Sequence, residues 1–196
     1  MQSPDEFNED AIQKLVTAAK GGDVASYEVL VRYFSPRLIS MVTGMIQNSH
    51  DAQDIVQDAM VRAYNALGRY EAKATFYTWL YRIAYNLTLN YVKSKKRKKQ
   101  VSMDQMEEQT GLNTTEFIDR SATSDPERQL ELEHLKKRLN KALQELSEKH
   151  RAVVTMFDIE GLPHAKIAEI LNISEGTVRS RLHYAHRELQ TKLSDN

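Results

Sequence analysis

Apolar residues recur every three or four positions along two stretches of this chain, about residues 9–97 and 127–193. That spacing is typical of amphipathic helices, whose apolar face packs against a neighbour. Residues 98–126 lie between the two stretches; they are polar, have no sustained period and end in an Asp-Pro pair. We interpret them as a flexible linker. The pattern therefore predicts an all-α protein of two small helical domains.

Breaks in the pattern divide the first stretch into separate helices. The pair Gly21–Gly22 ends the helix that begins near residue 9, and Asp23 can cap the next one. Another helix is expected to begin at residues 49–51, where a serine and an aspartate precede a new apolar period. The last helix of this stretch is predicted at about residues 75–95.

The second stretch ends in a pattern with the spacing of a helix-turn-helix. Ser147 can cap a helix that Gly161 ends, and residues 163–190 then form a short helix, a three-residue turn and a last helix capped by Ser174. The last helix is expected to bury a stripe of Val178, Leu182, Ala185 and Leu189. Its opposite face carries Gly176, Ser180, His183 and Arg187, flanked by Arg179, Arg181 and Tyr184. Such donors and cations suit base edges and phosphates in a major groove, although a solvated face on an ordinary helical hairpin gives the same pattern.

The helix predicted at 75–95 concentrates aromatic side chains, among them the single tryptophan, Trp79. At 100° per residue, one core stripe contains Phe76, Leu80, Ile83, Leu87 and Tyr91. A second face carries Thr78, Arg82, Asn86 and Lys93, and between the two faces lie Tyr77, Tyr81 and Tyr85. The basic run KSKKRKK follows at 93–99, either as a further contact with phosphates or as the solvated start of the linker. Aromatic side chains beside cations are typical of surfaces that stack the bases of single-stranded nucleic acid.

Composition narrows the class of protein further. The chain has 196 residues, few glycines and prolines, and no cysteine, which excludes disulfides and thiolate metal sites and suits a reducing cytoplasm. Its formal net charge is zero, yet residues 70–100 hold eight lysines and arginines against one glutamate. This local basic field favours a nucleic-acid partner. The acidic first residues predict no signal peptide, and no apolar run reaches the roughly 18–20 residues of a membrane span.

Three segments carry a resemblance to a known family: DAQDIVQDAMVRAYNAL (51–67), FYTWLYRIAYN (76–86) and IEGLPHAKIAEILNISEGTVRSRLHYAHREL (159–189). In this order and spacing they resemble regions 2 and 4 of the extracytoplasmic-function (ECF, group IV) sigma factors of bacterial RNA polymerase. The resemblance implies a region 2 bundle at 9–97, an acidic linker at 98–126 and a region 4 helix-turn-helix at 127–193. It further implies a cytoplasmic, stress-responsive factor that binds core polymerase through its β′ and β subunits, recognises −35 and −10 promoter elements and promotes melting.

The resemblance also assigns residues to these partners. The polar contacts with a coiled coil of the β′ subunit would be Asp54, Gln57 and Asp58. The −10 element, held as a single strand with a flipped base, would contact Tyr70, Thr75, Phe76, Tyr77, Trp79, Arg82, Asn86 and Lys93. The duplex −35 element would contact Arg179, Ser180, Arg181, His183, Tyr184 and Arg187. An anti-sigma factor is a further expected partner.

Two other classes of DNA- or polymerase-associated protein remain open at this point. A free-standing helix-turn-helix regulator would bind duplex DNA without polymerase and leaves the aromatic helix unexplained. An adaptor or decoy would use only the 51–67 helix and open no promoter. An enzyme has no support, because no phosphate loop, nucleophile elbow or pair of catalytic acids is found. His183 and His186 have no third ligand at suitable spacing, so we expect neither a metal nor a cofactor.

Overall fold

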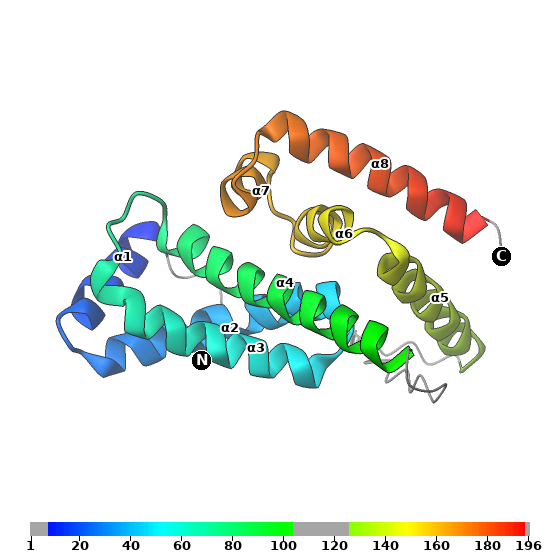
Figure 1. Cartoon of the computed structure of the whole chain (residues 1–196). Coiled ribbons are helices and arrows are strands. Elements are labelled where there is room, and N and C mark those ends of the chain that lie inside the picture. The colour runs from blue at the N-terminus through cyan, green and yellow to red at the C-terminus, as the bar shows by residue number, and fades with distance from the viewer. Residues whose placement is uncertain (1–7, 104–125, 195–196) are drawn as a thin grey trace.

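The computed structural model describes residues 8–103 and 126–194, and every regular element in these residues is a helix (Figure 1). The predicted all-α class is therefore confirmed for the part of the chain described. The N-terminal unit consists of α1 (Glu9–Lys20), α2 (Val24–Ile46), α3 (Ser49–Ala66), a 3₁₀ turn η1 (Leu67–Arg69) and α4 (Phe76–Met103). The C-terminal unit consists of α5 (Pro126–Glu145), α6 (Glu148–Val154), a π-helix η2 (Thr155–Ile159), α7 (His164–Leu171) and α8 (Glu175–Ser194).

Side-chain caps set the beginnings of the helices in the N-terminal unit. The side chains of Asn8, Asp23 and Asn48 accept hydrogen bonds from backbone N–H groups in the first turns of α1, α2 and α3. Helix α3 begins at Ser49, within the predicted range of 49–51, and Asn48 is its cap. Helix α2 continues through Pro36 without interruption, which makes it 23 residues long. It packs against α1, α3 and α4, and the core between them is centred on Phe34, which is fully buried.

The helix-turn-helix has the predicted form. Asn172, with φ 53°, ends α7 in the left-handed conformation, and the Ser174 hydroxyl accepts a hydrogen bond of 3.1 Å from Thr177 N. The expected stripe of α8 is buried against the preceding helices: Val178, Leu182, Ala185 and Leu189. The π-helix η2 was not expected, because the sequence predicted an ordinary helix as far as Gly161.

The structure differs from the sequence-based prediction at the end of α4 and in α5. Helix α4 continues to Met103, beyond the expected end near residue 95, so the proposed domain boundary at residues 97–98 lies inside a helix. Residues 104–125 of the predicted linker lie outside the described residues. In α5, the expected apolar stripe is only partly buried: Ala142, Leu143 and Leu146 are in the core, whereas the exposed members are Leu132, Leu135 and Leu139.

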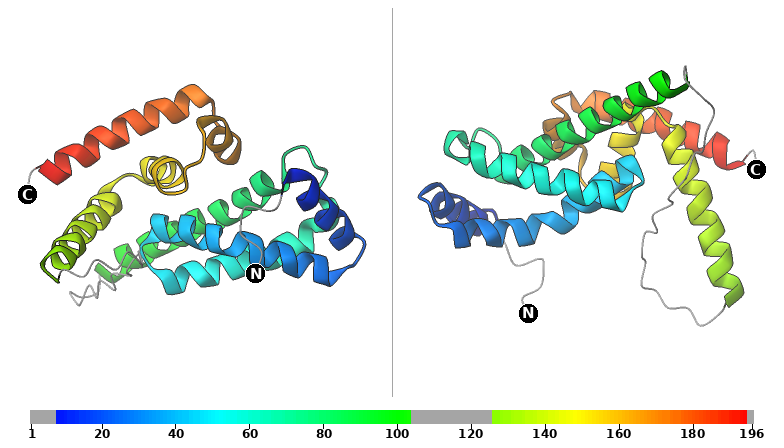
Figure 2. Two further views of the ribbon diagram at one scale, coloured as in Figure 1. Left: turned by 180° about the vertical axis from the view of Figure 1, so that it is seen from behind. Right: turned by 60° about the horizontal axis from the view of Figure 1, so that its bottom comes forward.

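The two units contact each other through α2 and α4 on one side and α6, η2 and α7 on the other (Figure 2). Two polar contacts fix α6 at this boundary. Arg151 Nη1 donates a hydrogen bond of 2.8 Å to the carbonyl of Met45, and Lys96 Nζ lies 2.7 Å from Glu148 Oε1. None of the helices in the described residues is both long and apolar enough to cross a membrane.

Candidate nucleic-acid and polymerase interfaces

Helix α8 presents most of the residues predicted to contact the −35 element. The exposed ones are Arg179, Ser180, His183, Tyr184 and Arg187, on the side opposite the buried stripe. The rings of His183 and Tyr184 meet edge to face with their centroids 5.5 Å apart, and Glu175 lies 3.9 Å from Arg179 Nη1. This face combines cations, a hydroxyl and an imidazole on one exposed side of a helix, which suits contact with base edges and phosphates.

Arg181 differs from its neighbours on α8 because it is half-buried and faces α4. Burial raises the pKa of Tyr85 on α4, and the positive charge of Arg181 opposes this rise. Arg181 is therefore placed near the N-terminal unit in this arrangement, away from the fully exposed face of α8. A contact with the −35 phosphates remains a prediction for this residue.

An aromatic cluster orders the loop between η1 and α4, where the −10 residues were predicted. Tyr70 and Phe76 are buried, with ring centroids 5.8 Å apart, and Trp79 packs against them at 5.0 and 5.6 Å (centroid to centroid). The Tyr70 hydroxyl donates a hydrogen bond of 2.7 Å to the carbonyl of Ala74, across the loop. Tyr70 and Phe76 thus have a supporting position, whereas Trp79 is half-buried. Ala72 in this loop has φ 56°, a conformation that costs energy for a residue with a Cβ.

The row of three tyrosines predicted beside the cationic face of α4 is not an open platform. Tyr77 and Tyr81 stack on each other with centroids 4.1 Å apart, and Tyr81 is fully buried. Burial raises the pKa of Tyr77 to about 12 and also raises the pKa of Tyr81, so both phenols stay neutral at physiological pH. The helical wheel missed this because it shows angles around one helix and cannot show a second unit that packs on that side.

That second unit engages the cationic face of α4 through α7. Arg82 donates two hydrogen bonds to the Glu169 carbonyl, at 3.0 Å from Nε and 2.6 Å from Nη2. The buried Thr78 hydroxyl donates to Glu169 Oε2 at 3.1 Å. Lys166 Nζ lies 3.3 and 3.2 Å from the hydroxyls of Thr75 and Thr78. Further along α4, Asn86 and Lys93 are exposed.

Glu160 lies between the two units, where its carboxyl faces Arg37, Ser40, Tyr77 and Tyr81. Burial raises the pKa of this carboxyl, and the Ser40 hydroxyl and the Arg37 charge oppose the rise. Because the pKa of Glu160 is higher in the folded than in the unfolded protein, its charged carboxylate destabilises the fold at neutral pH. This cost decreases as the pH falls through the raised pKa toward 4.5, the ordinary pKa of a glutamate.

We expect Glu160→Gln to be more stable than the parent protein at neutral pH, because the amide is neutral at every pH. The difference between the two proteins should narrow as the pH falls through the raised pKa. Urea unfolding of both proteins at about pH 7 and about pH 5 measures this. A difference that is the same at both values would contradict the buried position of the carboxylate.

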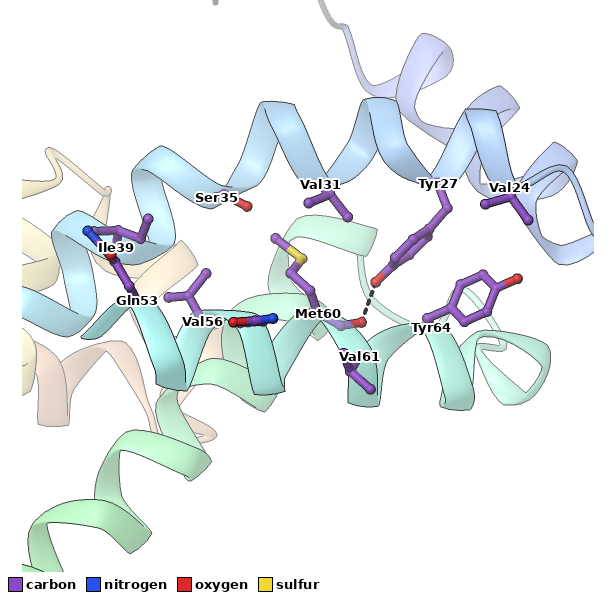
Figure 3. A pocket seen from close by; sticks show the side chains of 11 residues that line it. Val24, Tyr27, Val31, Ser35, Ile39, Gln53, Val56, Met60, Val61 and Tyr64 are labelled. Atoms are coloured by element: carbon purple, nitrogen blue, oxygen red, sulfur yellow. Dashed lines mark hydrogen bonds between the residues drawn. The ribbon is translucent and has the colours of Figure 1, made fainter. Parts of the chain in front are cut away.

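The predicted polymerase contacts are on α3, which also forms one wall of an apolar groove (Figure 3). Asp54, Gln57 and Asp58 are all exposed. The groove between α2 and α3 has a volume of about 510 Å³, and Gln57 is one of its lining residues. Within it, the Tyr27 hydroxyl donates a hydrogen bond of 2.6 Å to the carbonyl of Met60.

The groove also contains residues that the sequence reasoning missed. Val24, Val61 and Tyr64 line it and are exposed although they are large and apolar. Val61 and Tyr64 follow Gln57 by four and seven positions, which places them on the same side of α3. A helical wheel centred on the exposed side of this helix, where apolar residues are unexpected, could have found them.

Among the described residues, no group of three or more His, Asp or Glu side chains could hold a metal ion. His186 pairs with Asp158 at 2.7 Å and joins α8 to η2, while His183 lies against Tyr184.

Comparison with known proteins places both units in one family. A model described as Sigma-70 region 2 matches residues 30–98, and one described as Sigma-70, region 4 matches residues 136–189. The ECF RNA polymerase sigma-E factor of Escherichia coli K12 is 32% identical over 181 residues, which are 92% of this chain and 93% of that protein. SigW of Bacillus subtilis, an ECF sigma factor, is 30% identical over 94% of this chain and 97% of its own. The RNA polymerase sigma-H factor of Pseudomonas aeruginosa is 29% identical over 92% and 93%.

Solved structures share the fold. CnrH in complex with the cytosolic domain of CnrY has a TM-score of 0.65 at 21% identity, over 93% of this chain and 96% of that one. The sigma factor RpoE in complex with the anti-sigma factor NepR, from Bartonella quintana, has a TM-score of 0.62 at 22% identity, over 88% and 97%.

Proposed function

Because this chain belongs to the extracytoplasmic-function sigma factors of RNA polymerase, we propose that α8 reads the −35 element and that α4 with its preceding loop holds the −10 element. A protein of this family directs polymerase to promoters and catalyses no reaction itself. The observation that carries the assignment of α8 is its exposed face of Arg179, Ser180 and His183 on the second helix of a helix-turn-helix. Residues 9–97 would then bind the −10 element and residues 127–193 the −35 element, with residues 98–126 as the linker between them.

In the −10 site, the proposed roles follow the exposure of each residue. The groups that can reach DNA on the cationic face of α4 are Asn86, Lys93 and Arg82. Arg82 can do so once its hydrogen bonds to the Glu169 carbonyl are broken. Thr75, Tyr77 and Trp79 are half-buried and would shape the edge of the base pocket. The buried rings of Tyr70 and Phe76 would support this pocket from beneath.

Core polymerase would dock on α3. The exposed acids Asp54 and Asp58 each follow a glutamine that lines the groove, and the exposed Val61 and Tyr64 supply apolar area on the same helix. An apolar centre with a charged rim is the usual composition of a protein interface. An anti-sigma factor belongs to the same proposal, because CnrH and RpoE, which share this fold, were solved with such partners or with a partner's cytosolic domain. The proposal also includes a cytoplasmic location and a role in the response to stress.

In vitro transcription with core polymerase on a genomic promoter library tests the proposal. We expect initiation at a defined set of promoters sharing −35 and −10 elements. Asn86→Ala should impair promoter opening more than −35 binding, whereas Arg179→Ala should weaken duplex −35 binding by about 1–3 kcal/mol, or roughly 5- to 150-fold. Permanganate footprinting measures opening, and gel shifts of the closed complex measure −35 binding.

Both variants change exposed side chains, so a loss of folding is not expected to obscure the result. Equal effects of the two substitutions on both steps would contradict the division of roles between α4 and α8. Operator binding by the protein alone, without promoter-specific initiation, would favour a free-standing regulator.

A further inference from the structure

Helix α1 lies outside residues 30–98, the part of the chain that the region 2 model matches, yet it packs against η1 and α4 (Figure 1). We propose that α1 belongs to the −10 site and that Lys20, its last residue, is a positioning residue that holds the loop of the base pocket in shape. The inference rests on the proposed −10 role of α4 and its preceding loop. It assigns to Lys20 no direct contact with DNA.

A charge-assisted hydrogen bond connects α1 to this loop. Lys20 Nζ donates to the carbonyl of Tyr70 at 2.8 Å, although the two residues are 50 positions apart in the sequence. Tyr70 is the residue at which η1 ends and the loop toward α4 begins. A hydrogen bond from an ammonium group is roughly twice as strong as one between neutral groups, so this contact is suited to fixing one end of a loop.

The last turn of α1 is complete without the Lys20 side chain. The backbone N–H groups of residues 21–23 donate to the carbonyls of Thr17, Ala18 and Ala19, which caps the helix. The ammonium of Lys20 is therefore not needed to cap its own helix. It bonds instead to a carbonyl of the −10 loop.

Tyr70 connects this bond to the base pocket. Its ring centroid lies 5.0 Å from that of Trp79 and 5.8 Å from that of Phe76, and its hydroxyl donates to the Ala74 carbonyl at the other end of the loop. Trp79 is half-buried, at the edge of the proposed pocket. A displacement of the Tyr70 backbone would therefore move both the aromatic edge of the pocket and the far end of the loop.

The loop needs support because it contains a strained residue. Ala72 has φ 56°, a conformation that brings its Cβ close to a carbonyl oxygen. Such a residue keeps its conformation only where the surrounding contacts hold it, and strained residues of this kind are common at ligand sites. Its neighbours Glu71 and Lys73 are exposed, so the support comes from the ends of the loop, where Lys20 binds.

Helix α1 is itself held firmly, and its first turn also borders the site. Its buried stripe includes Ile12 and Val16, which anchor the helix in the N-terminal core. Glu9 and Ile12 line a pocket of about 400 Å³ together with Thr75 and Tyr77, two of the residues predicted for the −10 element. A supporting group on a rigid helix holds a binding loop more precisely than a group on another loop could.

Lys20→Met tests this role, because methionine keeps an unbranched stem and a similar helix propensity but cannot donate to the Tyr70 carbonyl. The assay is binding of the reconstituted holoenzyme to a forked DNA with a duplex −35 element and a single-stranded −10 element, made from a promoter recovered in the transcription assay. We expect about tenfold weaker binding of the forked DNA, and parent-like binding of a duplex that carries the −35 element alone. Lys20→Arg, which restores a cationic donor, should recover most of the loss.

The matched control is Lys14→Met, which makes the same substitution at another exposed position of α1. It should bind both DNA molecules as the parent does. Urea unfolding, followed by the fluorescence of Trp79, checks that the N-terminal unit of each variant is folded. Because Lys20 is exposed, we expect all three variants to fold.

Base preference and salt dependence distinguish a positioning residue from a lysine that binds a phosphate. A displaced loop alters the pocket, so Lys20→Met should discriminate about fivefold less between the preferred base and the other three at the flipped position. A lysine bound to a phosphate does not read the base, so its loss would weaken all sequences equally and reduce the slope of log K against log salt by about 0.7. We expect the slope to keep its parent value.

Parent-like binding and base preference in Lys20→Met would overturn the proposal. An equal loss for all four bases, with a smaller salt slope, would also overturn it and would make Lys20 a phosphate ligand. The same loss in Lys14→Met would overturn it as well, because the effect would then be one of charge on α1. Failure of the proposed function is read from the parent protein alone, as the absence of promoter-specific initiation or of any base preference in the −10 strand.

Discussion

Reversing two charges on α3, in the variant Asp54→Lys/Asp58→Lys, is expected to reduce affinity for core polymerase about 100-fold or more, or about 3 kcal/mol. Both carboxylates are exposed on α3, so lysine at both positions would place like charges against a partner surface that is complementary to acids. Asp54 lies 4.0 Å from His50 and Asp58 lies 2.9 Å from Arg62, and all four of these side chains are exposed. Exposed pairs of this kind contribute little to stability, so the fold should persist.

Competition for labelled core polymerase measures the affinity, and circular dichroism checks that the helices remain. The control is Asp10→Lys/Glu133→Lys, which makes the same change in net charge at exposed positions of α1 and α5, away from the groove. This control should keep the parent affinity. If both double variants bind equally weakly, the effect is one of overall charge and the docking surface is elsewhere. If both bind as the parent does, α3 is not the docking helix.

Local patterns predicted those parts of the fold that depend on neighbours in the sequence. The helix-turn-helix is the clearest case: Ser174 caps α8, and the stripe beginning with Val178 is buried as its spacing required. The exposure of Asp54, Gln57 and Asp58 agrees with their polar character on an amphipathic helix. These features follow from helix geometry and capping, which act over a few residues.

Features that depend on contacts between distant segments were not predictable in this way. The face of α4 that carries Thr78 and Arg82 looked open on a helical wheel, yet Thr78 is fully buried because α7, almost ninety positions later, packs on it. The exposed valine and tyrosine of α3 were missed for a related reason. Their side chains belong to a groove that exists only when α2 lies beside α3.

Phe34→Ala is expected to be the most destabilising single substitution considered, at about 3–5 kcal/mol. Phe34 is fully buried in α2, and its ring centroid lies 4.9 Å from that of Tyr33, 5.6 Å from Phe76 and 6.1 Å from Tyr77. Alanine would leave a cavity at the point where α2 meets the first turn of α4. Trp79, the single tryptophan, packs on Phe76, so its fluorescence during urea unfolding reports on this unit.

The same cavity should reduce −10 recognition before it reduces −35 recognition. The loss of Phe34 loosens Phe76 and Tyr77, on which the proposed base pocket depends, whereas α8 is packed within the other unit. At temperatures where the variant is partly unfolded, promoter opening should therefore fall while duplex binding by α8 persists. Phe34→Leu, which keeps most of the volume, should cost less than about 1.5 kcal/mol and retain opening. If alanine and leucine have equal effects, the ring of Phe34 does not support the pocket, and α4 must be positioned by its contacts with α3 instead.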